Sequence, residues 1–228
     1  MSMMPIELDE AKKHMSRLIG QRLSHVWKGY GAAIFLELGD LQPRGRNPCG
    51  AYSIHLDGDW RIESSKQVVA GSSNSNHCIE DAIKQLQGLE ISDIILTDPP
   101  IELCIVFGDG KKLRTMSALS GDPQWAVKLA EAQYLKARDG ALTIDDGKHS
   151  LSTGETDTAD MMHAVETARR WGTPESSINQ GCCERCASFI YLDASFSFLD
   201  FGVCTDATSP FDGKVTNVAN VCSKFRAA

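Results

Sequence analysis

Apolar and polar residues alternate along much of the first 140 residues in the manner of β-strands. Tyr52, Ile54 and Leu56 are separated by polar residues, which predicts a strand with one buried face. Short apolar runs bounded by Gly, Pro or Asp predict further strands at 23–27, 34–38, 60–63, 91–96, 101–107 and 112–116. Because Asp-Gly and Gly-Asp pairs lie between several of these runs, we expect many of the strands to be joined as hairpins.

Three stretches have apolar residues at helical spacing instead. They cover residues 8–18, 77–87 and 122–137. Gly20 and Gly88 follow the first two, as expected where a helix ends, and Pro123 occupies a favoured first position in the third. The fold class that these patterns predict for residues 1–140 is α+β, with a hairpin-rich antiparallel sheet and two or three helices.

A weak internal repeat relates residues 18–40 to residues 86–109. Each segment contains the end of a helix, a glycine, a strand, a turn, a second strand and a Gly-Asp pair. This arrangement resembles small uncharacterised bacterial α+β proteins, some of which are suspected immunity proteins because their genes lie near toxin genes. The resemblance extends from Leu18 to about Leu129 and implies a fold but no activity.

The composition changes after residue 140. Residues 141–157 are rich in Asp, Gly and Thr, which predicts a linker, although its few apolar residues could form one short edge hairpin. A helix is expected to begin near Asp157 and to end at about Gly172. We therefore expect an α+β domain over 1–140, a linker over 141–157, and a helix followed by a small β-rich, cysteine-containing module over 158–228.

Five of the eight cysteines lie after residue 181. Cys183 and Cys186 form a C-x-x-C pair, and Cys204 and Cys222 each follow after seventeen intervening residues. Four thiolates in this order can close a tetrahedral metal site. Cys182 is a possible substitute for Cys183, but we favour Cys183 because a two-residue spacing brings both sulfurs into one turn.

The residues around these cysteines follow the pattern C-x-x-C-x-x-F, G-x-C, S-P-x-D-G-x-V and C-x-x-F. They are Cys183, Cys186 and Phe189; Gly202 and Cys204; Ser209, Pro210, Asp212, Gly213 and Val215; Cys222 and Phe225. The pattern resembles a cysteine-rich module of uncharacterised bacterial proteins, notably an actinobacterial family of unknown function. That resemblance implies four metal-binding cysteines and no established activity.

A weaker likeness is to the high-potential iron–sulfur proteins. They share the C-x-x-C start and an F-x-G-K ending before the last cysteine, carried here by Phe211, Gly213, Lys214 and Cys222. The likeness implies an iron–sulfur cluster bound by the same four thiolates. Two features depart from it: those proteins are exported, whereas this chain shows no export signal, and its third cysteine lies farther from the phenylalanine.

Charge and composition narrow the range of partners. The net charge is −7 and the pI about 5.4, which disfavours binding to nucleic acid or to an anionic membrane. The chain has no run of eighteen apolar residues, and its N-terminus lacks the basic and apolar regions of a secretory signal. We therefore expect a cytoplasmic protein, in which clustered cysteines bind metal rather than form disulfides.

The functional expectation is a non-enzymatic, metal-binding protein whose partner is another protein. Zinc is the expected metal, because four thiolates leave it no open position. The alternative is an iron–sulfur electron carrier or redox sensor that uses the same cysteines. No catalytic motif occurs in the first domain, and we interpret His25 and His55 as structural; a hydrolase with either histidine in a pocket is a third hypothesis.

Overall fold

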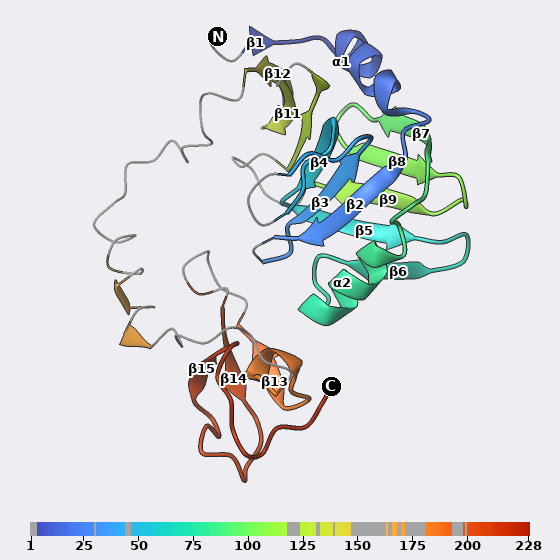
Figure 1. The fold of residues 1–228 in the computed structure, drawn as a ribbon. Helices are drawn as coiled ribbons and strands as arrows, with labels where there is room; N and C mark the ends of the chain where they lie inside the picture. Colours follow the sequence, from blue (N-terminus) through green and yellow to red (C-terminus); the bar gives the residue numbers. More distant parts are fainter. Residues whose placement is uncertain are drawn as a thin grey trace. The chain divides into compact units, whose positions relative to one another are not determined.

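The computed structural model covers a chain of 228 residues. It describes residues 4–29, 31–43, 47–117, 124–130, 133–138, 140–146, 163, 166–167, 170–171, 181–192, 198 and 200–228. The chain divides into two compact units, Met1–Ser150 and Leu151–Ala228, which we call the N-unit and the C-unit. Figure 1 shows the elements of each unit along the chain.

The first sheet of the N-unit has seven antiparallel strands in the order β1-β12-β11-β10-β4-β3-β2. Their bounds are β1 Met4–Pro5, β2 Leu23–Lys28, β3 Ile34–Leu38, β4 Tyr52–Leu56, β10 Trp125–Lys128, β11 Tyr134–Arg138 and β12 Ala141–Asp145. One face of this sheet is apolar, and Leu36, Ile54 and Val127 lie fully buried on it. Because side chains alternate along a strand, Glu37 and Ser53 lie on the opposite face.

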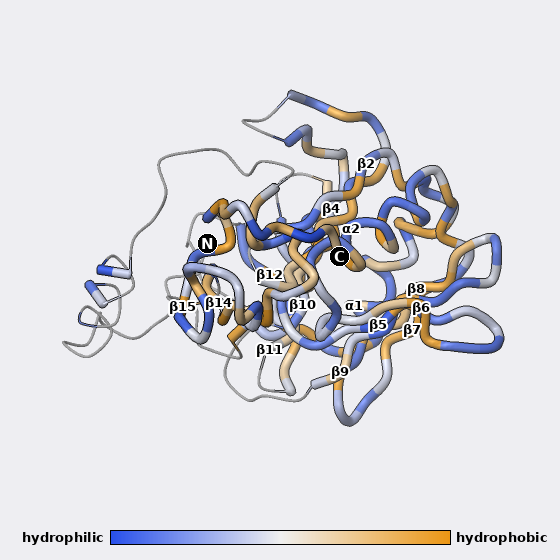
Figure 2. Tube along the Cα trace, turned by 90° about the horizontal axis from the view of Figure 1, so that it is seen from below, coloured by the Kyte–Doolittle hydropathy of each residue, from blue (hydrophilic) through white to orange (hydrophobic). Residues whose placement is uncertain are grey.

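The second sheet has five antiparallel strands in the order β6-β5-β9-β8-β7. Their bounds are β5 Asp59–Glu63, β6 Val68–Gly71, β7 Ile91–Leu96, β8 Leu103–Phe107 and β9 Lys112–Met116. Two helices accompany the sheets: α1 over Leu8–Met15, extended by the 3-10 turn η1 at Ser16–Leu18, and α2 over Asn76–Lys84. Hydrophobic residues gather in the strands of this sheet and hydrophilic ones at the turns between them (Figure 2).

The two segments that repeat in sequence form the same local structure. The β2–β3 hairpin of the first half and the β7–β8 hairpin of the second each contain a register shift, after Leu23 and after Ile91 respectively. Gly20 and Gly88 precede these strands with φ of 79° and 88°. Such positive φ angles are readily adopted only by glycine, which explains why glycine occurs at this position in both halves.

The two halves also exchange strands. β5 follows β4 along the chain but pairs with β9 of the second half, from Asp59 opposite Met116 to Glu63 opposite Lys112. β10 follows β9 but pairs with β4 of the first half. A single apolar cluster therefore joins both sheets and both helices.

The α+β fold class predicted from the sequence is wrong. The described part of the chain contains fifteen strands in three antiparallel sheets, and α1 and α2 are its two α-helices with defined bounds. The helix expected over 122–137 is replaced by β10 and β11, in which Val127 and Leu135 are fully buried. In so short a run the apolar positions fit both the 3.6-residue repeat of a helix and the two-residue repeat of a strand. The strand is favoured because β10 can form backbone hydrogen bonds with β4.

Residues 141–145 belong to the first sheet and not to a linker. β12 pairs with β11 on one side and with β1 on the other, which places Ile144 opposite Met4. Leu142 and Ile144 are both buried on the apolar face of the sheet. The division between the two units falls later, between Ser150 and Leu151.

The C-unit contains a three-stranded antiparallel sheet in the order β13-β14-β15. The bounds are β13 Phe189–Tyr191, β14 Phe201–Cys204 and β15 Val215–Asn217, and a 3-10 turn, η3, covers Cys183–Arg185. The helix expected over 157–172 lies mostly outside the described residues, although the described positions His163, Glu166, Thr167 and Arg170 have helical backbone. Within the described ranges, no helix has the length and apolar character needed to cross a membrane.

Candidate metal centre

The first two cysteines of the predicted site lie on one tight turn. Cys183 begins η3, and the Cys186 backbone N–H donates to the Cys183 carbonyl at 3.0 Å. Both thiols therefore project from the same turn, as the two-residue spacing predicted. Asn220 holds the turn in place, because its carbonyl accepts from the Cys183 N–H at 2.7 Å.

The C-terminal residues fasten the other side of this turn. The Ala187 N–H donates to the Arg226 carbonyl at 2.8 Å, and the Ala228 N–H donates to the Arg185 carbonyl at 3.0 Å. The Arg226 guanidinium also donates to the Ser188 hydroxyl at 2.6 Å. Two stretches that are about forty residues apart in sequence are thereby joined beside the thiols.

Cys204 is placed by the central strand of the C-unit sheet. It ends β14 directly opposite Phe189 of β13. The Phe189 ring lies close over Gly202, where a Cβ atom would stand only 2.4 Å from the ring and 2.4 Å from the Ile190 carbonyl oxygen. Gly202 is therefore required because Phe189 approaches the backbone closely at this position. The G-x-C pattern in the sequence does not reveal this reason.

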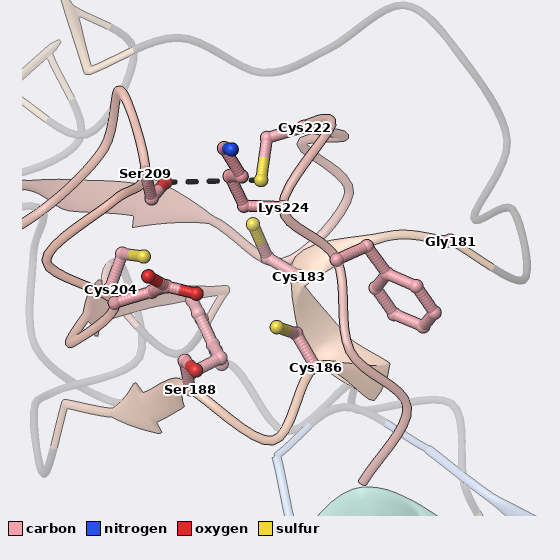
Figure 3. A pocket seen from close by; sticks show the side chains of 11 residues that line it. Gly181, Cys183, Cys186, Ser188, Cys204, Ser209, Cys222 and Lys224 are labelled. Atoms are coloured by element: carbon pink, nitrogen blue, oxygen red, sulfur yellow. Dashed lines mark hydrogen bonds between the residues drawn. The ribbon is translucent and has the colours of Figure 1, made fainter.

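Cys222 lies in the chain that follows β15. The Phe225 N–H donates to the Cys222 carbonyl at 3.3 Å, which folds C-x-x-F into a turn like that of C-x-x-C. The Ser209 hydroxyl lies 3.8 Å from the Cys222 sulfur (Figure 3). Ser209 comes from the loop between β14 and β15, so that loop and the C-terminal stretch meet at this thiol.

The four cysteines converge on one small cavity. Figure 3 shows the sulfurs of Cys183, Cys186, Cys204 and Cys222 pointing toward a common space. The cavity has a volume of about 10 Å³, and its other lining residues are Gly181, Ser188, Phe189, Asp206, Ser209, Lys224 and Phe225. Cys182 is fully buried, does not belong to this lining, and pairs through its backbone with Val221.

Burial and the neighbouring thiols both affect the ionisation of Cys183. Burial is the main cause that raises the pKa of the Cys183 thiol to about 11. The thiols of Cys222, Cys186 and Cys204 act next, in the same direction, because a second negative charge nearby disfavours ionisation. A hydrogen bond with Thr216 works the other way and lowers the pKa. Cys183 therefore keeps its proton at neutral pH unless a cation takes the proton's place.

The present positions of the side chains are not those of a metal-bound site. Nowhere among the described residues do three or more His, Cys, Asp or Glu side chains stand close enough together to hold a metal ion. Zinc–sulfur bonds near ~2.3 Å set tetrahedral sulfurs about 3.8 Å apart. The thiols that line the cavity would have to rotate inward to reach this geometry. All eight cysteines are free of disulfides, so the four thiols are chemically available.

The remaining cysteines lie on separate elements of the N-unit. Cys104 is buried in β8, where burial raises the pKa of its thiol, and Cys78 is exposed on α2. Cys49 lies before β4, and the Lys128 ammonium donates to its sulfur at 3.1 Å. None of these three cysteines lines the cavity that the four C-unit thiols share.

A buried carboxylate in the N-unit was not identified from the sequence. Glu37 is only 3% exposed and accepts three hydrogen bonds. The donors are the Trp27 indole N–H at 3.2 Å, the Gly50 N–H at 2.8 Å and the Ser53 hydroxyl at 3.1 Å. A glutamate in an otherwise apolar strand is the only signal, and it does not reveal donors that come from two other strands and a loop.

The two histidines of the first sheet lie on the same face of the sheet as this carboxylate. His25 is the cross-strand neighbour of Glu37, and its Nε2 atom is buried without a hydrogen-bond partner. His55 stacks on Phe35 with ring centroids 4.2 Å apart, and Phe35 stacks on Trp27 at 3.8 Å. Burial lowers the pKa of His55, although Asp57 acts in the opposite direction. The ring stack gives His55 a packing role, in line with its structural interpretation.

Comparisons with known proteins add no relative to this description. No family model, no curated protein and no solved structure matches the chain. The resemblances drawn from the sequence motifs therefore stay predictions. The candidate metal centre stands on the chain's own residues, through the convergence of four thiols that come from three separate stretches of sequence.

Proposed function

We propose that Cys183, Cys186, Cys204 and Cys222 bind one Zn²⁺ ion, and that the C-unit is a structural zinc module by which a non-enzymatic protein binds another protein. The observation that carries the proposal is the convergence of these four thiols on one small cavity. Four thiolates complete the tetrahedral shell of zinc and leave no position for a substrate. The ion then has a structural role and not a catalytic one.

The small amount of other buried material in the described part of the C-unit supports a metal. Its described apolar residues that are fully buried are Phe201 and Val218, together with the three cysteines Cys182, Cys183 and Cys204. So small a core cannot offset the conformational entropy lost on folding, and small domains of this kind are usually stabilised by disulfides or by a metal. Since the cysteines form no disulfides here, a metal is the stabiliser that remains.

The size of the cavity favours a single ion over an iron–sulfur cluster. A volume of about 10 Å³ is close to what one water-sized particle needs. A cluster with several iron and sulfide ions is bound by the same ligand type but needs considerably more room.

A protein partner is supported by the outer face of the C-unit sheet. Ile190, Val203 and Val215 lie directly opposite one another across the three strands, on the face away from Cys204. Ile190 is 59% exposed and Val215 is 39% exposed. Neighbouring apolar side chains at the surface are typical of protein interaction sites. The net charge of −7 disfavours nucleic acid and anionic membranes, and thiol ligands suit a reducing, cytoplasmic compartment.

Metal analysis of protein purified without oxygen tests the proposal. We expect one zinc per chain in the wild type and less than a tenth of that in Cys183→Ser, Cys186→Ser, Cys204→Ser or Cys222→Ser. Cys78→Ser, on the exposed face of α2, is the control that keeps its zinc. Cys182→Ser also keeps it, because that side chain does not line the cavity.

Two results would overturn the zinc assignment. Iron and acid-labile sulfide in the brown, oxygen-free protein would establish the iron–sulfur alternative at the same thiols. Wild-type protein that contains no metal, and takes up neither Zn²⁺ nor Co²⁺ on titration, would remove the metal centre altogether.

A further inference from the structure

Two hydroxyl groups stand beside two of the four thiols. The Ser209 hydroxyl lies 3.8 Å from the Cys222 sulfur, and hydrogen bonding by Thr216 acts to lower the pKa of the Cys183 thiol. Both residues are buried in the described C-unit. A buried hydroxyl needs an acceptor for its proton. Each sulfur can supply that acceptor, and each hydroxyl can in turn hold the sulfur in place.

Thr216 is aimed at the thiols by the sheet. It lies opposite Gly202 in the β14–β15 pair and so shares the face that carries Cys204. The Asn220 side-chain amide donates to the Thr216 hydroxyl oxygen. Asn220 is also the residue whose carbonyl holds the Cys183 N–H at 2.7 Å. Asn220 therefore contacts both residues: its side-chain amide binds Thr216, and its backbone carbonyl binds Cys183.

Ser209 has an equivalent arrangement on the other side of the site. The Phe211 backbone N–H donates to the Ser209 hydroxyl oxygen at 3.1 Å. A second backbone bond, from the Ser209 N–H to the Asp206 carbonyl at 2.8 Å, fixes the turn that presents the hydroxyl. The loop thus supplies a donor to the oxygen and leaves the hydroxyl proton available for Cys222.

The direction of these hydrogen bonds follows from the chemistry of a metal-bound thiol. A neutral thiol can donate or accept, whereas a thiolate that ligates a metal has lost its proton and can only accept. In both cases an N–H already occupies the hydroxyl oxygen, so the hydroxyl proton is available for the sulfur. A hydrogen bond to a charged acceptor is stronger than one to a neutral acceptor, so each contact strengthens when the metal binds.

We infer that Ser209 and Thr216 are positioning residues of the metal centre, which orient the Cys222 and Cys183 thiolates by donating hydroxyl hydrogen bonds to them. The inference rests on the proposed function, because it assigns these hydroxyls to ligands of the proposed ion. Loss of such a supporting contact typically lowers metal affinity by about 10- to 100-fold. We expect a loss of about tenfold in zinc affinity for each hydroxyl removed.

The test measures metal affinity in the full chain. Zn²⁺ is titrated against a chromophoric chelator in the wild type, Ser209→Ala and Thr216→Val, and in Ser209→Thr and Thr216→Ser, which restore a hydroxyl. Thr205→Val is the matched control, because the Thr205 hydroxyl donates to the Ser188 carbonyl at 3.0 Å and not to a sulfur. Affinity should fall in the first pair, recover in the second, and stay within twofold in the control.

Co²⁺ substitution separates orientation from simple stability. A hydrogen bond stabilises the sulfur electrons that move to cobalt in the thiolate-to-metal absorption band. Its loss should therefore shift this band to longer wavelength in Ser209→Ala and Thr216→Val but not in Thr205→Val. A merely structural role would change affinity without moving the band.

The outcomes distinguish this inference from the proposed function. If the wild type binds one zinc through the four cysteines while both hydroxyl variants keep its affinity and its cobalt band, the inference fails and the proposed function stands. A wild type that binds no metal overturns both. If Thr216→Val fails to fold, Ser209→Ala decides the matter on the same two measurements.

Discussion

The two units of this protein differ in how much apolar material their described residues bury. The N-unit contains one cluster of thirty buried apolar residues that spans both of its sheets and both of its helices. In the described part of the C-unit, two buried apolar residues accompany three buried cysteines. The difference teaches that one chain can contain both a large apolar core and a unit for which, under the proposed function, folding would depend on what its thiols bind.

The largest expected effect is loss of the C-unit alone when the metal is removed. Binding free energies of structural zinc are about 10–16 kcal/mol and are coupled to folding, so Cys204→Ser or a strong chelator should unfold this unit. Hydrogen exchange followed by mass spectrometry should show rapid exchange over 200–228, while β3 and β8 keep their protection. Unchanged protection over 200–228 would show that the C-unit is stable without metal.

The reciprocal change affects the N-unit core. Leu36 is fully buried in β3, so Leu36→Ala should lower the free energy of unfolding of the N-unit by about 2–5 kcal/mol. Zinc content should stay at one per chain. Urea denaturation followed by tryptophan fluorescence measures the loss, and Ile95→Ala, at an exposed position in β7, is the control expected to change stability by less than about 0.5 kcal/mol. Zinc loss in Leu36→Ala would mean that the two units are not independent.

A smaller effect is expected at the buried carboxylate of the N-unit. Glu37→Leu removes the acceptor of three hydrogen bonds and leaves the Trp27 and Gly50 N–H groups without it. Leaving buried donors unsatisfied costs about 1–3 kcal/mol. Glu37→Gln keeps one carbonyl oxygen as an acceptor and should lose less than Glu37→Leu in the same denaturation experiment. Equal stability of the two variants would argue that the hydrogen bonds contribute nothing.

The smallest effect concerns a surface carboxylate of the second sheet. Burial works to raise the pKa of Glu63, but hydrogen bonds from Arg61 and Arg114 outweigh it and hold the pKa below its ordinary value of 4.5. A lowered pKa means that the contribution to stability is complete above the ordinary pKa and is lost as the pH falls through the folded value. Since both arginine side chains are more than a third exposed, we expect at most about 1 kcal/mol.

Unfolding of the wild type and of Glu63→Gln at two pH values measures this contribution. The variant should be the less stable protein at pH 7, and the difference should disappear near pH 2. A difference that persists at the acidic pH would assign it to packing instead of charge.

Most strands of the N-unit could be predicted because their signals are local. Alternation places Ile54 and Leu56 on one face, and glycine marks the turns, so neither prediction needs knowledge of the partner strand. The helix expected over 122–137 failed for the converse reason. Trp125 and Val127 are strand residues because β4 offers them a free edge, and that edge is formed some seventy residues earlier in the chain.

In the candidate metal centre, too, the local features could be predicted from the sequence and the tertiary contacts could not. The spacing of Cys183 and Cys186 on one turn was visible from the sequence, because it depends on three peptide bonds. The fastening of that turn by Asn220 and Arg226 was not, because it depends on tertiary pairing of the C-terminal residues. The buried state of Glu37 was hidden for the same reason, since its donors Trp27, Gly50 and Ser53 come from different parts of the chain.

The pairing of β1 with β12 has a consequence for the protein during its synthesis. Met4 lies opposite Ile144, so the first strand has no partner until about 140 further residues have been translated. At roughly 5–20 residues per second this delay is about seven to thirty seconds. β4 and β5 pair earlier with β3 and β6, but each keeps one edge unpaired until β10 and β9 are made. A ribosome that pauses before β12 therefore holds a nascent chain with open sheet edges, which are the features that pair with other chains in aggregation.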